Sequence, residues 1–350
     1  MIIVLKQNLF DSFIFFCIIE ATCSPRFSSD QRAQGELFVF PLMATSYTKH
    51  PLSCIDQLDL LKQRGLCIDD DAKALHLLQH ISYYRLSGYW YTLLEEPKVE
   101  QHFKSNASFQ TAFKIYCFDR ELRQLVLGEI EKIEVAVKSQ MIQVLSQGFG
   151  PNWYADPARF MNHKNNHTKT LEKLLDDYKH SREDFIIAFK KTHADVPPPC
   201  WVIMEIASFG RISSLYADLR GGKSKRAIAN HFGLDDSSFA SWLHCIGYLR
   251  NICAHHSRFW NREFRLAPQV PQHPSKIWLQ NYAATNRAYF MLSMILYFLQ
   301  TINPKNTFNE KFSKLLGKYP NIDSKAMGFP VTWQSERLWS DQVMAVDWVD

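Results

Sequence analysis

The sequence predicts an all-α protein. Between Asp119 and Leu145, seven apolar residues recur at intervals of three and four, which is the period of one long amphipathic helix. No segment alternates apolar and polar residues as a half-buried strand does, and neither an internal repeat nor a glycine-rich phosphate loop is present. With 46% hydrophobic and 14% aromatic residues in a chain of 350, a large core can be buried.

Short helices are predicted ahead of the long one. Ser53 and Asp56 can cap a segment that Gly65 stops, and the three aspartates at 69–71 place negative charge at the start of another helix. The block that follows, residues 80–90, is dense in aromatic side chains. We expect most of them to pack in a core; the alternative is a surface on which bases stack.

The remaining segments also favour helices. Glycine and proline at 148–151 end the long helix, and the prolines at 197–199 indicate a loop within one helical body that spans residues 43–339. Residues 288–299 form an apolar run of about a dozen residues, too short to cross a bilayer and typical of a buried helix. Residues 340–350 are predicted to be a tail.

Residues 1–42 do not match the chain that follows. The apolar stretch from Leu9 to Ile19 resembles a signal peptide only weakly, because Asp11 interrupts it and Glu20 stands where small residues should precede a cleavage site. Two interpretations remain. Residues 1–42 are either a disordered or mis-started extension ahead of a true start at Met43, which we favour, or a targeting segment.

Charge and cysteine usage narrow the class of protein. The net charge is +5, and the segment from Lys223 to Arg265 carries seven Lys/Arg against three Asp/Glu, so it accounts for +4. This segment could contact an anionic partner such as RNA, or be a solvated basic face. Eight scattered cysteines without a C-x-x-C pair predict reduced thiols in a cytoplasmic protein, with no metal site, cofactor or membrane segment.

The basic segment holds the candidate chemistry. Asp235 can cap a helix whose apolar residues line one face, and the stretch from Tyr248 to Arg262 is predicted to continue it as helix. An arginine can hold a phosphate, and a histidine can move a proton near neutral pH. The candidate residues are Arg250, Asn251, His255, His256, Arg258 and Arg262.

Helical geometry indicates that one copy of this segment does not complete a site. Asn251 and His255, four apart, are nearly stacked, whereas Arg250 and His255, five apart, lie about 140° apart around the axis. Two copies facing each other across a two-fold axis would supply two arginines and two histidines to one cleft. We therefore expect a homodimer.

The motif also resembles known families. R-x-x-x-x-H, formed by Arg250 and His255, resembles the signature of the HEPN ribonuclease superfamily, and R-N-x-x-A-H-H-S-R-x-W-N-R resembles the AbiD/AbiF-like abortive-infection (Abi) family. The resemblance extends from about residue 47 to 339 and includes residues 80–90 and 319–339. It implies a HEPN-like helical bundle with additional N- and C-terminal helices, a site shared across a dimer, and a role in phage defence or as a toxin, with an antitoxin or a phage-encoded trigger as further partners.

The function predicted from motif and resemblance is a metal-independent endoribonuclease. His255 would move the proton of a ribose 2′-hydroxyl or of the leaving oxygen, while Arg250 stabilises charge on the phosphoryl oxygens. Asn251 would orient His255 or the phosphate, and His256 is a second acid or base. Arg258 and Arg262, one turn apart, are either phosphate contacts or plain surface charge, and the adjacent Phe259 and Trp260 are expected to pack.

Two alternatives remain. The same helix could bind RNA or a protein without cleaving, with Arg250 and His255 in structural roles. Residues 225–234 and the helix after them also weakly resemble a helix-turn-helix DNA-binding regulator. That alternative requires a recognition helix with polar residues facing a groove, yet this one carries Phe239, Trp242 and Leu243.

Overall fold

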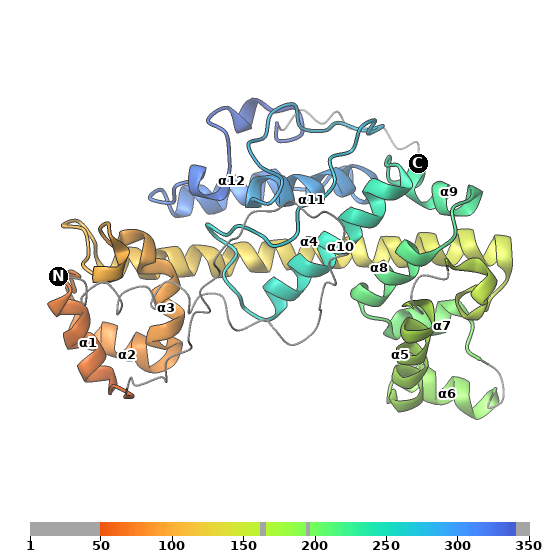
Figure 1. The fold of residues 1–350 in the computed structure, drawn as a ribbon, viewed down its shortest axis with the longest axis horizontal. Helices are drawn as coiled ribbons and strands as arrows, with labels where there is room; N and C mark the ends of the chain where they lie inside the picture. The colour runs from red at the N-terminus through yellow and green to blue at the C-terminus, as the bar shows by residue number, and fades with distance from the viewer. Residues whose placement is uncertain (1–49, 162–165, 194–196, 341–350) are drawn as a thin grey trace, which may run out of the picture. The chain divides into compact units, whose positions relative to one another are not determined.

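The predicted all-α class is confirmed. The computed structural model describes residues 50–161, 166–193 and 197–340, and in these ranges it has twelve α-helices, three isolated bridges and no strand (Figure 1). The helices are α1 (Cys54–Gln63), α2 (Asp71–Ile81), α3 (Tyr83–Trp90), α4 (Phe109–Phe149), α5 (Asn166–His180), α6 (Asp184–Thr192), α7 (Cys200–Ile206), α8 (Phe209–Asp218), α9 (Lys223–His231), α10 (Asp236–Ala254), α11 (Ala288–Ile302) and α12 (Phe308–Lys318). Single 3-10 turns are η3 (Tyr91–Leu93), η4 (Lys98–Glu100), η5 (Trp153–Ala155), η6 (Pro157–Arg159), η7 (Lys325–Met327) and η8 (Trp333–Ser335).

The chain divides into two compact units, Met1–Tyr116 and Cys117–Asp350, and the division falls inside α4. The single domain expected over residues 43–339 stays a prediction. The extension predicted for residues 1–42, and the tail predicted for 340–350 beyond Ser340, lie outside the described residues.

In the first unit, local sequence signals set the helix ends. Ser53 accepts from the backbone N–H of Asp56, and the Asp56 carboxylate accepts from the Ser53 backbone, so the expected cap of α1 is a full capping box. Most of the aromatic block packs as expected, because Leu86, Tyr89 and Trp90 are at most 3% exposed. Tyr84 is the exception at 54%.

In the second unit, the apolar stripe of α4 is buried. Ile130, Ile133 and Val137 have no exposed surface, which confirms the prediction of a long amphipathic helix. The helix is longer than predicted at both ends, because it begins at Phe109 and runs through Gly148 to Phe149. Gly150 then turns the chain with φ +82°, a value that favours glycine.

The apolar run at 288–299 lies in α11, and its side chains are buried as expected. Helices α8, α9 and α11 pack against α10, the helix that carries the candidate motif. No helix in the described residues is both long enough and apolar enough to cross a membrane.

Candidate active site

Helix α10 is fixed at its start by a cap and along its length by burial. The Asp235 carboxylate accepts from the backbone N–H groups of Ser237 and Ser238 at 3.0 and 2.8 Å. The stripe predicted to face the core does so, at no more than 3% exposure, through Phe239, Trp242, Leu243, Ile246, Leu249 and Ile252. The side chains on its opposite face are therefore carried by a helix that cannot rotate without unpacking the core.

The same burial weakens the helix-turn-helix alternative. Trp242 and Leu243 have no exposed surface, so they cannot reach a DNA groove. The beginning of α10, where a recognition helix contacts bases, carries Asp235 and Asp236, whose charge repels phosphates.

The helix ends within the motif, which corrects one expectation. The stretch from Tyr248 to Arg262 was predicted to be helical throughout, yet α10 stops at Ala254 and His255 is its C-cap. His256 donates its backbone N–H to the Cys253 carbonyl at 3.1 Å, and Ser257 donates to the Ile252 carbonyl at 2.9 Å. These two bonds make a Schellman turn, which satisfies carbonyls at the helix end and sends the chain off the axis.

His256 occupies the left-handed position of this turn. Its φ is +57°, at the place where most helices use glycine. A β-carbon in this conformation costs about 1 kcal/mol, although histidine tolerates it better than branched residues do. Sequence periodicity missed the turn because no glycine or proline marks it. The turn leaves His255 at the edge of the helix rather than in its middle.

A buried carboxylate from α4 holds the loop after the turn. Asp119 has no exposed surface, and its Oδ1 accepts from the backbone N–H groups of Phe259 at 3.0 Å and Trp260 at 2.6 Å. Arg123, one turn further along α4 and 4% exposed, forms an ion pair with the same carboxylate. Phe259 and Trp260 are themselves buried, so their expected packing is confirmed. The loop is thus fixed by backbone bonds and by two aromatic anchors.

Sequence reasoning did not identify Asp119 as part of this region. It lies 140 residues from Phe259, and no short-range pattern joins the two. A signal was nevertheless present, because Asp119 stands three residues before Leu122, in line with the apolar stripe of α4. A charged residue in an otherwise apolar stripe requires a buried partner.

The cysteines in α10 do not behave as nucleophiles. Burial raises the pKa of the Cys253 thiol to about 12, against the opposing charge of Arg123, and burial raises that of Cys245 to about 12 as well. Both remain protonated thiols at neutral pH, whereas nucleophilic attack needs the thiolate. Nowhere in the described part of the chain do three His, Cys, Asp or Glu side chains gather as a possible metal site.

The predicted site residues fall into two groups. Arg250, Asn251, His255 and His256 are exposed, and the His255 backbone N–H donates to the Asn251 carbonyl at 2.9 Å, one turn back. Arg258 and Arg262 are half-buried, and Arg262 Nη1 donates to the Arg258 carbonyl at 3.1 Å. One face of α10 therefore presents imidazoles and an amide to solvent, with Arg250 on its flank.

One further histidine shares that face. His244 is exposed and lies seven residues before Asn251 and eleven before His255, so the three side chains project within about 40° of one direction. Its position on the exposed face could have been found from this spacing. It lies outside the R-x-x-x-x-H pattern, and the motif alone did not identify it.

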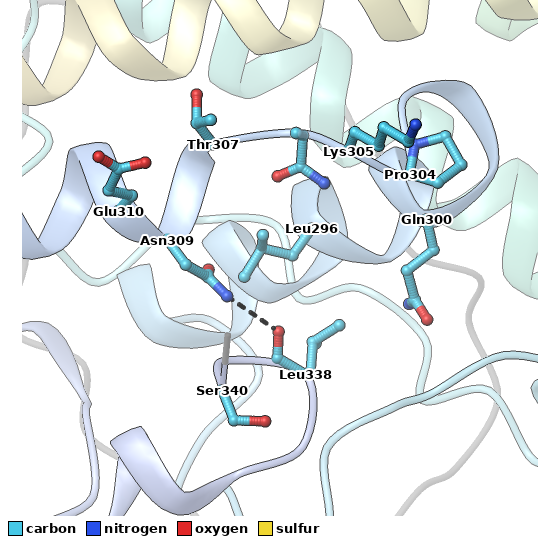
Figure 2. A pocket seen from close by; sticks show the side chains of 10 residues that line it. Leu296, Gln300, Pro304, Lys305, Thr307, Asn309, Glu310, Leu338 and Ser340 are labelled. Carbon is cyan, nitrogen blue, oxygen red and sulfur yellow. Dashed lines mark hydrogen bonds between the residues drawn. The ribbon is translucent and has the colours of Figure 1, made fainter. Parts of the chain in front are cut away.

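A pocket lies elsewhere in the second unit. A pocket of about 360 Å³ is lined by the end of α11, the start of α12 and Leu338 and Ser340 (Figure 2). Figure 2 shows Asn309 reaching across it to the Leu338 carbonyl, a hydrogen bond of 3.3 Å. No predicted site residue lines this pocket. The candidate site lies outside this pocket, at an exposed helix end.

The contacts of the Asp119 carboxylate with Arg123, Phe259 and Trp260, called the Asp119 clamp from here on, lead to a stability prediction. Asp119→Asn replaces an acceptor with a group that can also donate, removes the charge opposite buried Arg123, and should lower the free energy of unfolding by about 3 kcal/mol or more. The control is Glu121→Gln, two residues further along α4, where Glu121 pairs with the exposed Lys318 at 2.8 Å. This substitution should cost less than about 1 kcal/mol. Denaturant unfolding followed by tryptophan fluorescence measures both. Equal losses would contradict the clamp.

The backbone of His256 leads to a second prediction. His256→Gly removes the strained β-carbon and should leave the free energy of unfolding unchanged or raise it by up to about 1 kcal/mol, whereas His256→Ala keeps the strain. Asn251→Gly, in the helical part of α10, serves as the control and should cost about 0.5 kcal/mol. Thermal unfolding of the three variants is the measurement, and a glycine variant less stable than the alanine variant would refute the left-handed turn.

Comparison with known proteins gives one match. The family model described as Abi-like protein matches residues 76–261, just over half of the chain, and includes the clamp on α4 and every predicted site residue except Arg262. No curated protein matches the chain, and no solved structure does. The match indicates a role in abortive infection. The chain belongs to the Abi-like protein family.

Proposed function

We propose that this chain is a metal-independent endoribonuclease of the HEPN type that acts in abortive infection. The observation that carries the proposal is the exposure of Arg250 and His255 at the end of a helix whose other face is buried and whose following loop is clamped by Asp119. Cleavage of an RNA chain requires reactive groups that the RNA can reach and that rigid elements hold in place.

The reaction is a transesterification at a ribose phosphate. The 2′-oxygen attacks the neighbouring phosphorus, a new O–P bond forms, and the bond from phosphorus to the 5′-oxygen breaks. The proton of the 2′-hydroxyl passes to a base, and the leaving 5′-oxygen receives a proton from an acid. The products are a 2′,3′-cyclic phosphate and a 5′-hydroxyl. His255 serves as one of the two proton-transfer groups, and Arg250 stabilises the charge that grows on the phosphoryl oxygens.

The other predicted residues support this step. Asn251, one turn before His255, orients its imidazole or the phosphate. His256 is a second acid or base whose backbone is held by the Schellman turn. Arg258 and Arg262 contact phosphates further along the RNA, and the bond from Arg262 to the Arg258 carbonyl keeps the two arginines together.

The site is shared between two copies of the chain. Arg250 points about 140° away from His255 around α10, so one copy does not aim both groups at a single phosphate. A homodimer across a two-fold axis supplies the missing group from the partner. The substrate is cytoplasmic RNA, and an antitoxin or a phage-encoded trigger would control the activity.

Single substitutions test the proposal. Arg250→Ala and His255→Ala should each reduce RNA cleavage by about 100-fold or more, because each removes a group that acts in the transition state. Cleavage by the unaltered protein should persist in a chelator and yield 2′,3′-cyclic phosphate ends, measured by gel and mass spectrometry. In cells, growth arrest should be lost with the same variants.

Matched controls remove an arginine and a histidine elsewhere in the chain. Arg220→Ala and His273→Ala alter an exposed arginine and an exposed histidine outside the motif and should leave cleavage unchanged. If His255→Ala binds RNA and arrests growth like the unaltered protein, the chain is the non-cleaving binding module. Loss of cleavage in a chelator would contradict the metal-independent mechanism.

A further inference from the structure

One guanidinium contacts the residues on both sides of Arg262, the last residue of the motif. Arg287 Nη2 donates to Asn261 Oδ1 at 3.1 Å, and Arg287 Nη1 donates to Glu263 Oε1 at 3.3 Å. Arg287 stands 26 residues beyond Asn261 in the chain. The backbone that carries Arg262 is therefore held before and after this residue by the same distant side chain.

Asn261 also turns the chain ahead of Arg262. Its φ is +46°, in the left-handed region, which asparagine occupies more often than most residues other than glycine. Trp260 and Asn261 form a turn, and Arg262 Nη1 returns to the Arg258 carbonyl at 3.1 Å. An extended chain would place the α-carbons of Arg258 and Arg262 roughly 13 Å apart. The orientation of Arg262 thus depends on the turn that Arg287 holds at Asn261.

Arg287 is itself fixed by the segments around it. Its side chain is 19% exposed, it is the N-cap of the buried helix α11, and its Nη2 also donates to the Ala326 carbonyl. The backbone of Gly328 closely approaches its aliphatic stem, because a β-carbon at this glycine would lie 2.6 Å from Arg287 Cβ. A guanidinium with three partners and a packed stem keeps one orientation, and so it can order the residues that it binds.

Arg287 does not need to touch RNA to influence its binding. Both of its terminal nitrogens bind protein groups, whereas Arg262 is half-buried and, in the proposed function, contacts a phosphate away from the cleaved bond. An arginine that is already ordered loses less conformational freedom when it binds a phosphate. The pairing of Arg287 with Glu263 also reduces the repulsion between this carboxylate and the RNA backbone.

We propose that Arg287 is a positioning residue that orders Arg262 for its phosphate by holding Asn261 and Glu263 on either side of it. The inference rests on the proposed function, in which Arg262 contacts RNA, and adds to it a residue outside the range of the family match. Because this contact lies away from the cleaved bond, it stabilises the bound substrate and the transition state alike. Arg287 therefore affects KM and not kcat.

Substitutions at both ends of the hydrogen bond test the inference. Arg287→Ala should raise KM for RNA by about 10-fold and change kcat by less than about 2-fold. Asn261→Gly suits the left-handed turn but removes the acceptor, so it should raise KM by a similar factor. Asn261→Asp keeps an acceptor for Arg287, and its KM should stay within about 3-fold of that of the unaltered protein.

The same substitution in a chain without Arg262 shows whether Arg287 acts through it. In an Arg262→Ala background, Arg287→Ala should change KM by less than about 2-fold, because the side chain that it orders is already absent. Arg211→Ala is the matched control, since Arg211 is another partly buried arginine with an ion pair, to Asp177, and its loss should leave KM unchanged. Circular dichroism checks that each variant is folded. Arg287→Lys, which cannot bridge all three partners, replaces the alanine variant if that one is unfolded.

The outcomes separate the two proposals. If the unaltered protein does not cleave RNA, the proposed function fails, and the same variants are then compared by the dissociation constant for RNA, measured by fluorescence anisotropy. An unaltered protein that neither cleaves nor binds RNA overturns both proposals. If Arg287→Ala leaves KM unchanged, lowers kcat alone, or raises KM equally with and without Arg262, the positioning role is overturned.

Discussion

One buried carboxylate holds the loop that follows the candidate motif. Asp119 reaches from the long helix α4 and accepts two backbone N–H groups at Phe259 and Trp260, while Arg123 balances its charge. Such a carboxylate is costly to bury, and only a complete set of partners offsets the cost. Because the loop cannot shift without breaking this set, the helix end that precedes it is fixed from both sides.

The end of α10 is both rigid and exposed. The buried face of α10 packs on α8, α9 and α11, and the Schellman turn at His256 ends the helix where the motif begins to leave the core. Exposed side chains on such a support lose little conformational freedom when they bind a phosphate. The match to the Abi-like family model covers both Asp119 on α4 and the pair Arg250 and His255 at the end of α10.

Periodicity predicted the helices well, and it failed where the structure depends on contacts distant in sequence. The stripe of α4 and the buried run of α11 could be predicted because helical spacing alone decides which face is apolar. The end of α10 could not be predicted, because a histidine, His256, occupies the left-handed position that most helices give to glycine. The role of Asp119 could not either, because its partners are backbone groups 140 residues away. His244 was accessible to sequence reasoning but lies outside the motif.

The central claim is that Arg250 and His255, at a clamped helix end, act on a phosphate attacked by its own ribose. An RNA with a single 2′-deoxy substitution at a mapped cleavage position measures this most directly, because it removes the nucleophile and leaves the remaining contacts in place. The account predicts that cleavage at that position disappears while neighbouring positions are still cut. Cleavage that continues at the substituted position would contradict it.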